Sequence, residues 1–224
     1  MPTVLVLDVE RLSGADTERL YRAVPAERRA RADRLHSAAD RARCLAAGVL
    51  LRHALLVRHG LTPAELDTAR DAYGKPYLAH VPGLHFSLSH ARRWVACATS
   101  ETEIGVDIEH TAAGAVDISH RFAPDEHAYV AAAPPGRRAG RLVRIWTLKE
   151  SYVKYLGRGL AVPMDSFSVR ARDRHPRALR GTLDVRPRLK QVAHGDGYWL
   201  AECSRDDSGI AVRELSREDL LAVC

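Results

Sequence analysis

Two carboxylates lie two residues apart in an otherwise apolar stretch of the chain, Gly105-Val106-Asp107-Ile108-Glu109. In a β-strand the side chains alternate between the two faces, so Asp107 and Glu109 would share one face and the aliphatic residues the other. Their Cα atoms would be about 6 to 7 Å apart, which lets both carboxylates reach one divalent cation. Hard oxygen ligands suit Mg²⁺, which takes one or two carboxylates together with phosphate oxygens of a substrate.

The same five residues also fit an edge strand that buries its Ile and Val side chains and exposes its Asp and Glu side chains to water. On this stretch alone, the solvated strand and the metal site both remain open. A metal site here requires further acids, or cations that bind phosphate, elsewhere in the chain.

A second group of ionisable residues lies on the strongest predicted helix, Arg141 to Leu156. Its apolar residues recur every three or four positions and predict a broad buried stripe. Glu150 and Lys154 are four residues apart and would share one face of this helix, partly buried beside Trp146. A buried carboxylate needs a cation, which a lysine or a metal ion would supply.

Several residues at turns and on helices offer groups that bind phosphate. In Gly74-Lys75-Pro76 the glycine and proline would fix a lysine just before a short strand, and Phe86-Ser87-Leu88-Ser89-His90 ends a strand with a serine and a histidine. Arg28, Arg31 and Arg43 lie along a long arginine-rich helical tract. Each has an ordinary alternative: an exposed lysine, a hydrogen-bonded turn residue, or the solvated face of a helix.

A weak internal repeat relates the two halves of the chain. Each half predicts a long helix, a glycine-bearing turn, a strand that contains Phe-Ser, and a hairpin partner. The paired segments are Ala39 to Arg58 and Arg141 to Leu156, Gly74-Lys75-Pro76 and Gly157-Arg158-Gly159, Phe86-Ser87 and Phe167-Ser168, and Trp94 to Ala98 and Trp199 to Cys203. We therefore predict an α+β fold of two similar α/β-type sandwich halves, residues 1–104 and 105–224, related by a pseudo-twofold axis.

In this fold each half holds a small, mainly antiparallel sheet packed on a long helix, and the acidic strand lies at the seam. Shorter segments complete the expected order of elements. Further strands are expected at Val4 to Val9, Pro163 to Val169, Leu183 to Val185 and Tyr198 to Cys203, and further helices at Asp16 to Ala23, Asp117 to Phe122, from Pro124, and at Arg213 to Leu221.

The composition limits the classes of protein and of partner. The 224 residues carry a formal charge of +6, which favours an anionic partner. The four cysteines show no CxxC spacing, so reduced structural thiols are expected and not a disulfide framework or a zinc site. The apolar run before Asp8 is too short for a signal peptide, and no stretch approaches the roughly 18 apolar residues of a membrane span. We therefore expect a cytoplasmic protein with no membrane partner.

Four motifs converge in order and spacing: Gly74-Lys75-Pro76, Phe86-Ser87-Leu88-Ser89-His90, Gly105-Val106-Asp107-Ile108-Glu109, and Trp146-Thr147-Leu148-Lys149-Glu150-Ser151 with Lys154 and Gly157-Arg158-Gly159-Leu160. Together they resemble the 4′-phosphopantetheinyl transferases of the Sfp type, which activate carrier proteins of peptide and polyketide synthases. Each motif is weak alone, but the combination is specific. The resemblance runs from about Arg28 to Val169 and agrees with a fold of two α/β halves that hold the cofactor between them.

The resemblance implies a function and a set of site residues. The expected reaction is Mg²⁺-dependent transfer of 4′-phosphopantetheine from coenzyme A to a serine of an apo acyl or peptidyl carrier protein, with release of 3′,5′-ADP. The pathways served would be peptide, polyketide or fatty acid synthesis, including secondary metabolite biosynthesis. The implied residues are Asp107, Glu109 and Glu150 as metal ligands, Lys75, Ser89, His90 and Lys154 as coenzyme A contacts, and Arg28, Arg31 and Arg43 near the nucleotide phosphates.

The expected catalytic residues are Glu150, Lys154 and His90. Mg²⁺ would orient the pyrophosphate and act as a Lewis acid, and Glu150 would be the general base, directly or through water. Lys154 and His90 would stabilise charge on the phosphates. The loop from Thr111 to Phe122 would face the carrier protein, and we expect a monomer.

Two other classes of function remain as alternatives. A nucleic-acid-binding module would use the arginines, but the chain has few aromatic residues, no RNP-like strand and no recognition helix, so no nucleic-acid partner is expected. A different Mg²⁺-dependent phosphoryl enzyme, such as a nucleotidyl transferase or a hydrolase, could share the same carboxylates.

Overall fold

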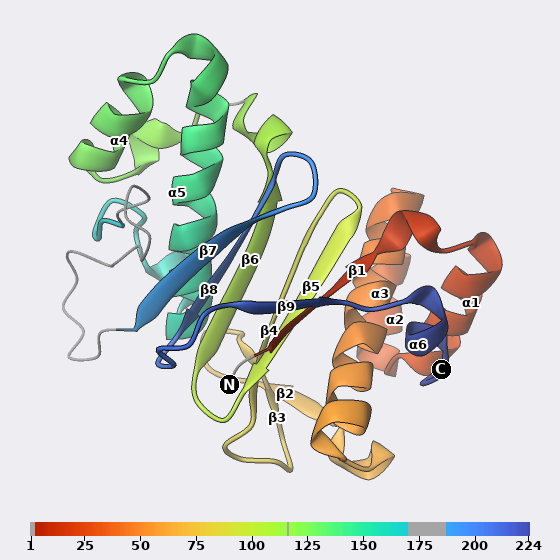
Figure 1. The fold of residues 1–224 in the computed structure, drawn as a ribbon. Helices are drawn as coiled ribbons and strands as arrows, with labels where there is room; N and C mark the ends of the chain where they lie inside the picture. Colours follow the sequence, from red (N-terminus) through yellow and green to blue (C-terminus); the bar gives the residue numbers. More distant parts are fainter. Residues whose placement is uncertain (1–2, 116, 170–186) are drawn as a thin grey trace.

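Two β-sheets lie in the middle of the computed structural model, with helices on both outer flanks (Figure 1). The structure describes residues 3–115, 117–169 and 187–224. The first sheet has the order β4-β5-β1-β9, in which β1 and β9 are parallel and the other neighbours antiparallel. The second sheet is antiparallel with the order β6-β8-β7, and β2 and β3 form a separate hairpin. The strands are β1 (Thr3–Asp8), β2 (Thr68–Arg70), β3 (Pro76–Leu78), β4 (His85–Ala91), β5 (Trp94–Ser100), β6 (Ile104–His110), β7 (Arg188–His194), β8 (Tyr198–Ser204) and β9 (Ala211–Glu214).

The helices divide between the two sheets. The α-helices are α1 (Gly14–Ala23), α2 (Ala26–Asp33), α3 (Ala38–His53), α4 (Pro124–Ala131), α5 (Pro135–Leu156) and α6 (Arg217–Leu221). A π-helical segment, η2 (Ala54–Arg58), continues α3, and short 3₁₀ helices are η1 (Val9–Arg11), η3 (Pro63–Glu65), η4 (Thr111–Ala115), η5 (Ser119–Arg121) and η6 (Gly159–Ala161). No helix in the described ranges is long and apolar enough to cross a membrane.

Alternate residues of β1 are buried in two different hydrophobic cores. Leu5 and Leu7 pack with α1, α2 and α3 in one core, whereas Val4 and Val6 pack against the second sheet together with the aliphatic residues of β6. A third core lies between α5 and the outer face of the second sheet. The molecule is therefore an α+β sandwich in which small, mainly antiparallel sheets pack on long helices, which confirms the predicted fold class.

The strand of the two acids, β6, lies where the two sheets meet. Its amides at Val106 and Ile108 donate hydrogen bonds to the hydroxyls of Ser87 and Ser89 on β4, at 3.0 and 3.3 Å. These side-chain bonds satisfy backbone donors that an unpaired edge would leave open. As the alternation predicts, Val106 and its aliphatic neighbours are buried between the sheets, and the acids point to the other face.

Gly105 explains why β6 and α5 approach so closely. A Cβ atom at this position would lie 2.0 Å from the carbonyl oxygen of Ser151 and 2.4 Å from the amide nitrogen of Tyr155. The glycine therefore lets the strand contact the helix backbone directly. This contact brings the acidic face of β6 against the face of α5 that carries Glu150 and Lys154.

One predicted strand is wrong, and the structure gives the reason. Residues 163–169 form turns, with only Val169 in a β-bridge. The Phe167 carbonyl accepts from Lys149 Nζ and the Val169 amide donates to the Glu126 carboxylate, both at 2.6 Å. Buried charged side chains thus satisfy this backbone in place of a neighbouring strand. The strand predicted at Leu183 to Val185 falls outside the described residues.

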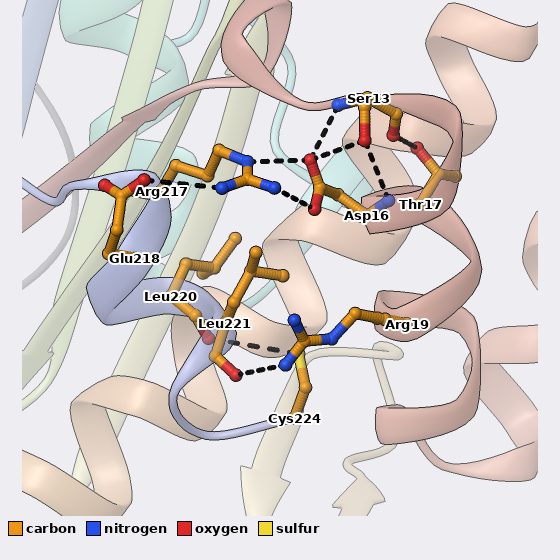
Figure 2. Close-up of polar contacts among 9 residues, drawn as sticks. All are labelled: Ser13, Asp16, Thr17, Arg19, Arg217, Glu218, Leu220, Leu221 and Cys224. Carbon is orange, nitrogen blue, oxygen red and sulfur yellow. Dashed lines mark hydrogen bonds and ion pairs between the residues drawn. The ribbon is translucent and has the colours of Figure 1, made fainter.

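The end of the chain returns to the first sheet. Strand β9, which the sequence did not predict, pairs with β1, and the terminal helix begins at Arg217 and not at Arg213. Arg217 donates two hydrogen bonds to the Asp16 carboxylate, at 2.6 and 2.8 Å, and Arg19 donates to the carbonyl of Leu221 (Figure 2). The boundary expected at residues 104/105 stays a prediction, since residues 211–221 pack on the N-terminal half.

All four cysteines are free thiols, and Cys44, Cys97 and Cys203 are buried. This agrees with the expected reduced, structural role. Burial raises the pKa of the Cys97 thiol to about 12, so this side chain behaves as a small apolar residue.

Candidate active site

A cavity of about 1000 Å³ is lined by residues from both sides of the predicted boundary at 104/105. Its walls come from α2, α3, the β2–β3 hairpin, β4, β6, α5 and the segment after α5. Nine of the ten site residues expected from the sequence line it: Arg28, Arg31, Lys75, Ser89, His90, Asp107, Glu109, Glu150 and Lys154. The remaining residue, Arg43, is not among the lining residues.

Asp107 is the centre of the polar groups in this cavity. The residue is 4% exposed, and its Oδ1 accepts hydrogen bonds from Ser89 Oγ and from Lys154 Nζ, each at 2.7 Å. Its Oδ2 is buried and has no hydrogen-bond partner among the described residues. Because a buried carboxylate oxygen is costly to leave unpaired, this atom marks a place where a cation or a donor fits.

Two further carboxylates face the same centre with altered acidity. Burial, followed by the charge of Asp107, raises the pKa of Glu109 to about 7. The same two causes raise the pKa of Glu150 above its usual range, and Lys154 opposes the rise for both acids. One lysine cannot neutralise all three acids when they are ionised, so an added cation would favour their ionised forms.

Ser89 has its hydroxyl proton directed at Asp107. The same oxygen accepts the Ile108 amide, so the hydroxyl orients the acid relative to β6. With its one proton donated to Asp107, Ser89 has no second donor for a ligand phosphate. The coenzyme A contact expected for this side chain stays a prediction, whereas its contact with Asp107 is observed.

Lys75 lines the cavity, but its ammonium group is already bound. Nζ forms an ion pair with Glu103 and donates to the Tyr155 carbonyl at 3.2 Å. The turn around it is fixed because Asp71 Oδ1 accepts the amides of Tyr73 and Lys75. A phosphate group would have to compete with Glu103 for this lysine.

The three arginines expected near phosphates differ in their surroundings. Arg28 is half-buried and donates to the Cys44 carbonyl at 3.2 Å, while Arg31 is exposed. The Arg43 guanidinium forms an ion pair with Asp40 and donates to the Arg92 carbonyl at 2.7 Å. Arg43 therefore holds α3 to the β4–β5 turn, outside the cavity wall.

His90 lines the cavity and is an exposed residue, although neighbouring protein atoms partly desolvate its ring. Burial lowers the pKa of its imidazole, and the nearby cations Arg43, Lys154 and Arg31 act in the same direction. The ring is therefore neutral at pH 7 and offers one N–H donor, not a full positive charge.

Comparisons with known proteins agree with this geometry. A family model described as the 4′-phosphopantetheinyl transferase superfamily matches residues 103–203, and one described as 4′-phosphopantetheinyl transferase, N-terminal, matches residues 13–102. A 4′-phosphopantetheinyl transferase of Bacillus subtilis is 39% identical over 163 residues, which cover 72% of this chain and 73% of the relative. The 4′-phosphopantetheinyl transferase Sfp of Bacillus subtilis strain 168 is 31% identical over 222 residues, 94% and 95% of the two chains.

The chain belongs to the 4′-phosphopantetheinyl transferases of the Sfp type. A further relative, 4′-phosphopantetheinyl transferase psf-1 of Bacillus pumilus, is 29% identical over 208 residues, which cover 92% of this chain and 89% of the relative. The similarity thus spans both halves of the transferase and the cavity between them.

The transferase's three acids offer hard oxygen atoms, the ligand type that Mg²⁺ prefers, although Lys154 Nζ already donates a hydrogen bond to Asp107. Within residues 3–115, 117–169 and 187–224, no group of three His, Cys, Asp or Glu side chains is placed so that it could hold a metal ion. The unpaired Oδ2 of Asp107 and the raised pKa values of Glu109 and Glu150 nevertheless describe a hard-oxygen donor set short of positive charge. The three acids therefore remain the predicted ligands.

Sequence reasoning missed a buried ion pair that supports the transferase's cavity. Lys149 is fully buried, and its Nζ contacts Glu126 at 2.6 Å and lies 4.1 Å from the centre of the Phe167 ring. The sequence signal for this ion pair was the position of Lys149 within the apolar stripe of its helix. Its partner at the start of α4 could not be identified by spacing. Arg121, on η5, also lines the cavity and was not expected there.

Proposed function

We propose that the transferase moves 4′-phosphopantetheine from coenzyme A to a serine hydroxyl of an apo acyl or peptidyl carrier protein and releases 3′,5′-ADP. One observation carries this proposal. The cavity between the halves combines a basic wall with Asp107, whose buried Oδ2 is unpaired beside Glu109 and Glu150. Such a site suits a substrate that carries a pyrophosphate together with a divalent cation.

Asp107, Glu109 and Glu150 would hold Mg²⁺. When bound, Mg²⁺ would neutralise charge on the pyrophosphate and polarise it for attack. Ser89 keeps Asp107 in place through its hydroxyl, and Lys154 supplies a second positive charge from α5. The family membership and the buried acids support this assignment.

Glu150 is the proposed general base, acting directly or through one water. Burial and Asp107 raise the pKa of this carboxyl, which makes it a better proton acceptor near neutral pH. The serine oxygen would attack the phosphorus that bears the pantetheine arm while Glu150 takes the hydroxyl proton. The bond from that phosphorus to the bridging oxygen then breaks, and 3′,5′-ADP leaves.

Cations of the cavity wall would bind the phosphates. Lys154 and the neutral His90 would donate to the pyrophosphate, and Arg28 and Arg31 to the nucleotide end. Lys75 would join them if a phosphate displaces Glu103.

The partners and setting are part of the same proposal. The segment from Thr111 to Phe122, which holds η4 and η5, follows the acidic strand directly, so we propose that the carrier protein binds against it. Carriers of peptide, polyketide or fatty acid synthases are the proposed substrates. Four free cysteines suit a reducing compartment such as the cytoplasm, and a monomer suffices because one chain supplies the whole cavity wall.

Mass spectrometry of apo carrier proteins tests the proposal. Incubation with coenzyme A, Mg²⁺ and the transferase should add the mass of one phosphopantetheine to the carrier, and EDTA should prevent it. The Asp107→Asn variant should lose at least about a hundredfold in rate, since it removes a charged group from the site. Asp207→Asn, an exposed acid that pairs with Arg188, is the matched control. Release of phosphate from nucleotides without any carrier would instead favour another phosphoryl enzyme.

A further inference from the structure

Gly48 occupies an unusual place for a glycine, the buried interior of α3. Glycine is less favourable than alanine inside a helix, so a packing reason is expected. A Cβ atom at this position would lie 2.3 Å from Cδ and 2.8 Å from Nε of Arg28, and 2.9 Å from Cγ1 of Val24. The position is therefore filled by the arginine side chain that crosses it from α2.

The guanidinium of Arg28 ends on the same turn of α3. Its Nη1 donates to the carbonyl of Cys44, the carbonyl that the amide of residue 48 reaches in an α-helix. Arg28, Cys44 and Ala47 all line the cavity between the halves. The absence of a side chain at Gly48 therefore determines the position of the Arg28 guanidinium at the cavity wall.

The ionised groups around Arg28 leave its positive charge available to bind an anion. Within the part of the chain that the structure describes, Arg28 has no ion-pair partner. The neighbouring Glu27 instead accepts two hydrogen bonds from Arg70, at 2.9 and 3.1 Å. Burial lowers the pKa of the Arg28 guanidinium, and Arg31 acts in the same direction. A half-buried cation whose described hydrogen-bond partner is a neutral carbonyl complements a phosphate group well.

We propose that Gly48 is a positioning residue for phosphate recognition. By having no side chain, it lets Arg28 lie flat across α3, where the guanidinium contacts a phosphate group of coenzyme A. This inference rests on the proposed function, because it takes coenzyme A as the ligand. Any side chain at position 48 displaces Arg28 or pushes away Val24, which caps α1 just before α2.

Calorimetric titration of coenzyme A into four proteins tests the proposal: wild type, Gly48→Ala, Arg28→Ala and the double variant. Each single substitution should raise Kd about tenfold, which corresponds to one charged hydrogen bond. The double variant should bind no more weakly than Arg28→Ala alone, because the two closest contacts of the added Cβ are with the arginine. The kcat at saturating coenzyme A should stay within about twofold for Gly48→Ala while KM rises.

A matched helical glycine provides the control. At Gly140, on α5, an added Cβ would meet no atom within 4 Å, so Gly140→Ala should leave Kd unchanged. If Gly48→Ala does not fold but the double variant does, the clash with Arg28 is established, and a raised Kd of Arg28→Ala then supports the proposal while an unchanged Kd overturns it. Wild-type affinity in Gly48→Ala, or an equal loss in the Arg28→Ala background, would overturn it. A wild-type protein that binds no coenzyme A would instead contradict the proposed function itself.

Discussion

The two glutamates of the cavity show how burial prepares a side chain for chemistry. Glu109 has its pKa raised from 4.5 to about 7, so the folded protein holds this proton more tightly than the unfolded chain does. The stability that comes from the protonated form is fully present below about pH 4.5 and is lost as the pH rises through about 7. Without a divalent cation, the ionised site therefore destabilises the fold at neutral pH.

A Glu109→Gln variant makes this effect measurable. In EDTA, the difference in free energy of unfolding between the variant and wild type should increase in favour of the variant as the pH rises from about 4.5 to 8. The increase should be at most about 3 kcal/mol. Urea unfolding of both proteins at several pH values measures the difference, in which the contributions of the histidines cancel. Mg²⁺ should stabilise wild type and shrink the gap. A difference that is independent of pH would contradict the assignment.

At the residue scale the sequence located acids better than it located their partners. Period-two alternation predicted the face shared by Asp107 and Glu109, and i to i+4 spacing predicted the face of Lys154. Arg43 shows the limit, because its binding to the Arg92 carbonyl joins elements far apart in the sequence. No local pattern distinguishes such an arginine from one that lines a cavity.

At the element scale, the position of β6 against α5 depends on Gly105. An alanine here would place its Cβ 2.0 Å from the carbonyl oxygen of Ser151, and a backbone atom cannot rotate away as a side chain can. We expect Gly105→Ala to destabilise the fold by about 1 to 3 kcal/mol and to lower kcat by moving Asp107 away from α5. Thermal unfolding and steady-state kinetics measure both effects.

Gly209→Ala is the control for this substitution, because an added Cβ there would meet no atom within 4 Å. Unchanged kcat in Gly105→Ala would show that the close approach of strand and helix is not required for the reaction.

The strand wrongly predicted at residues 163–169 shows a limit of sequence patterns at the level of elements. Its alternating apolar residues resemble a strand, but the pair Lys149 and Glu126 binds its backbone instead. Helices were easier to predict, since the apolar stripe of α5 is continuous over many turns. Periodicity reports which residues are buried and does not report what satisfies the backbone.

Breaking the buried pair should therefore be costly. Lys149→Met leaves Glu126 buried without its cation, and we expect a loss of about 3 to 5 kcal/mol in the free energy of unfolding. The double variant with Glu126→Gln should recover part of that loss. Arg137→Met, on the exposed end of α5, should change stability by less than about 0.5 kcal/mol. Urea denaturation compares them, and a loss in Lys149→Met no larger than in Arg137→Met would contradict the structural role.

At the scale of the whole molecule, the internal repeat predicted two halves but not the return of the chain end. Strand β9 is short, and its parallel pairing with β1 joins residues about 200 positions apart. Leu215, Leu220 and Leu221 complete the core of the N-terminal half. Such a closure leaves little trace in local sequence, because its partners are separated by nearly the full chain.

Arg217 adds a polar contact between the chain end and the N-terminal half. Its two hydrogen bonds hold the pKa of the Asp16 carboxyl well below its usual range, with help from the amide of Ser13 (Figure 2). A depressed pKa stabilises the fold above the unfolded value of 3.8, and this stabilisation is lost gradually as the pH falls from that value through the lower pKa of the folded protein. The ion pair should therefore contribute most at neutral pH and less as the pH falls below 3.8.

We expect Arg217→Ala to lower Tm by about 2 to 4 °C for each kcal/mol lost at pH 7, and to lower Tm by less near pH 3, where part of the stabilisation is already lost. Because Arg52 of α3 donates to the carbonyl of Val223, just after α6, at 2.7 Å, the loss should loosen the helix that carries Cys44 and Gly48. Arg213→Ala, an exposed arginine of β9, is the control and should leave Tm unchanged. If Arg217→Ala lowers Tm equally at both pH values, apolar packing and not the ion pair fixes the chain end.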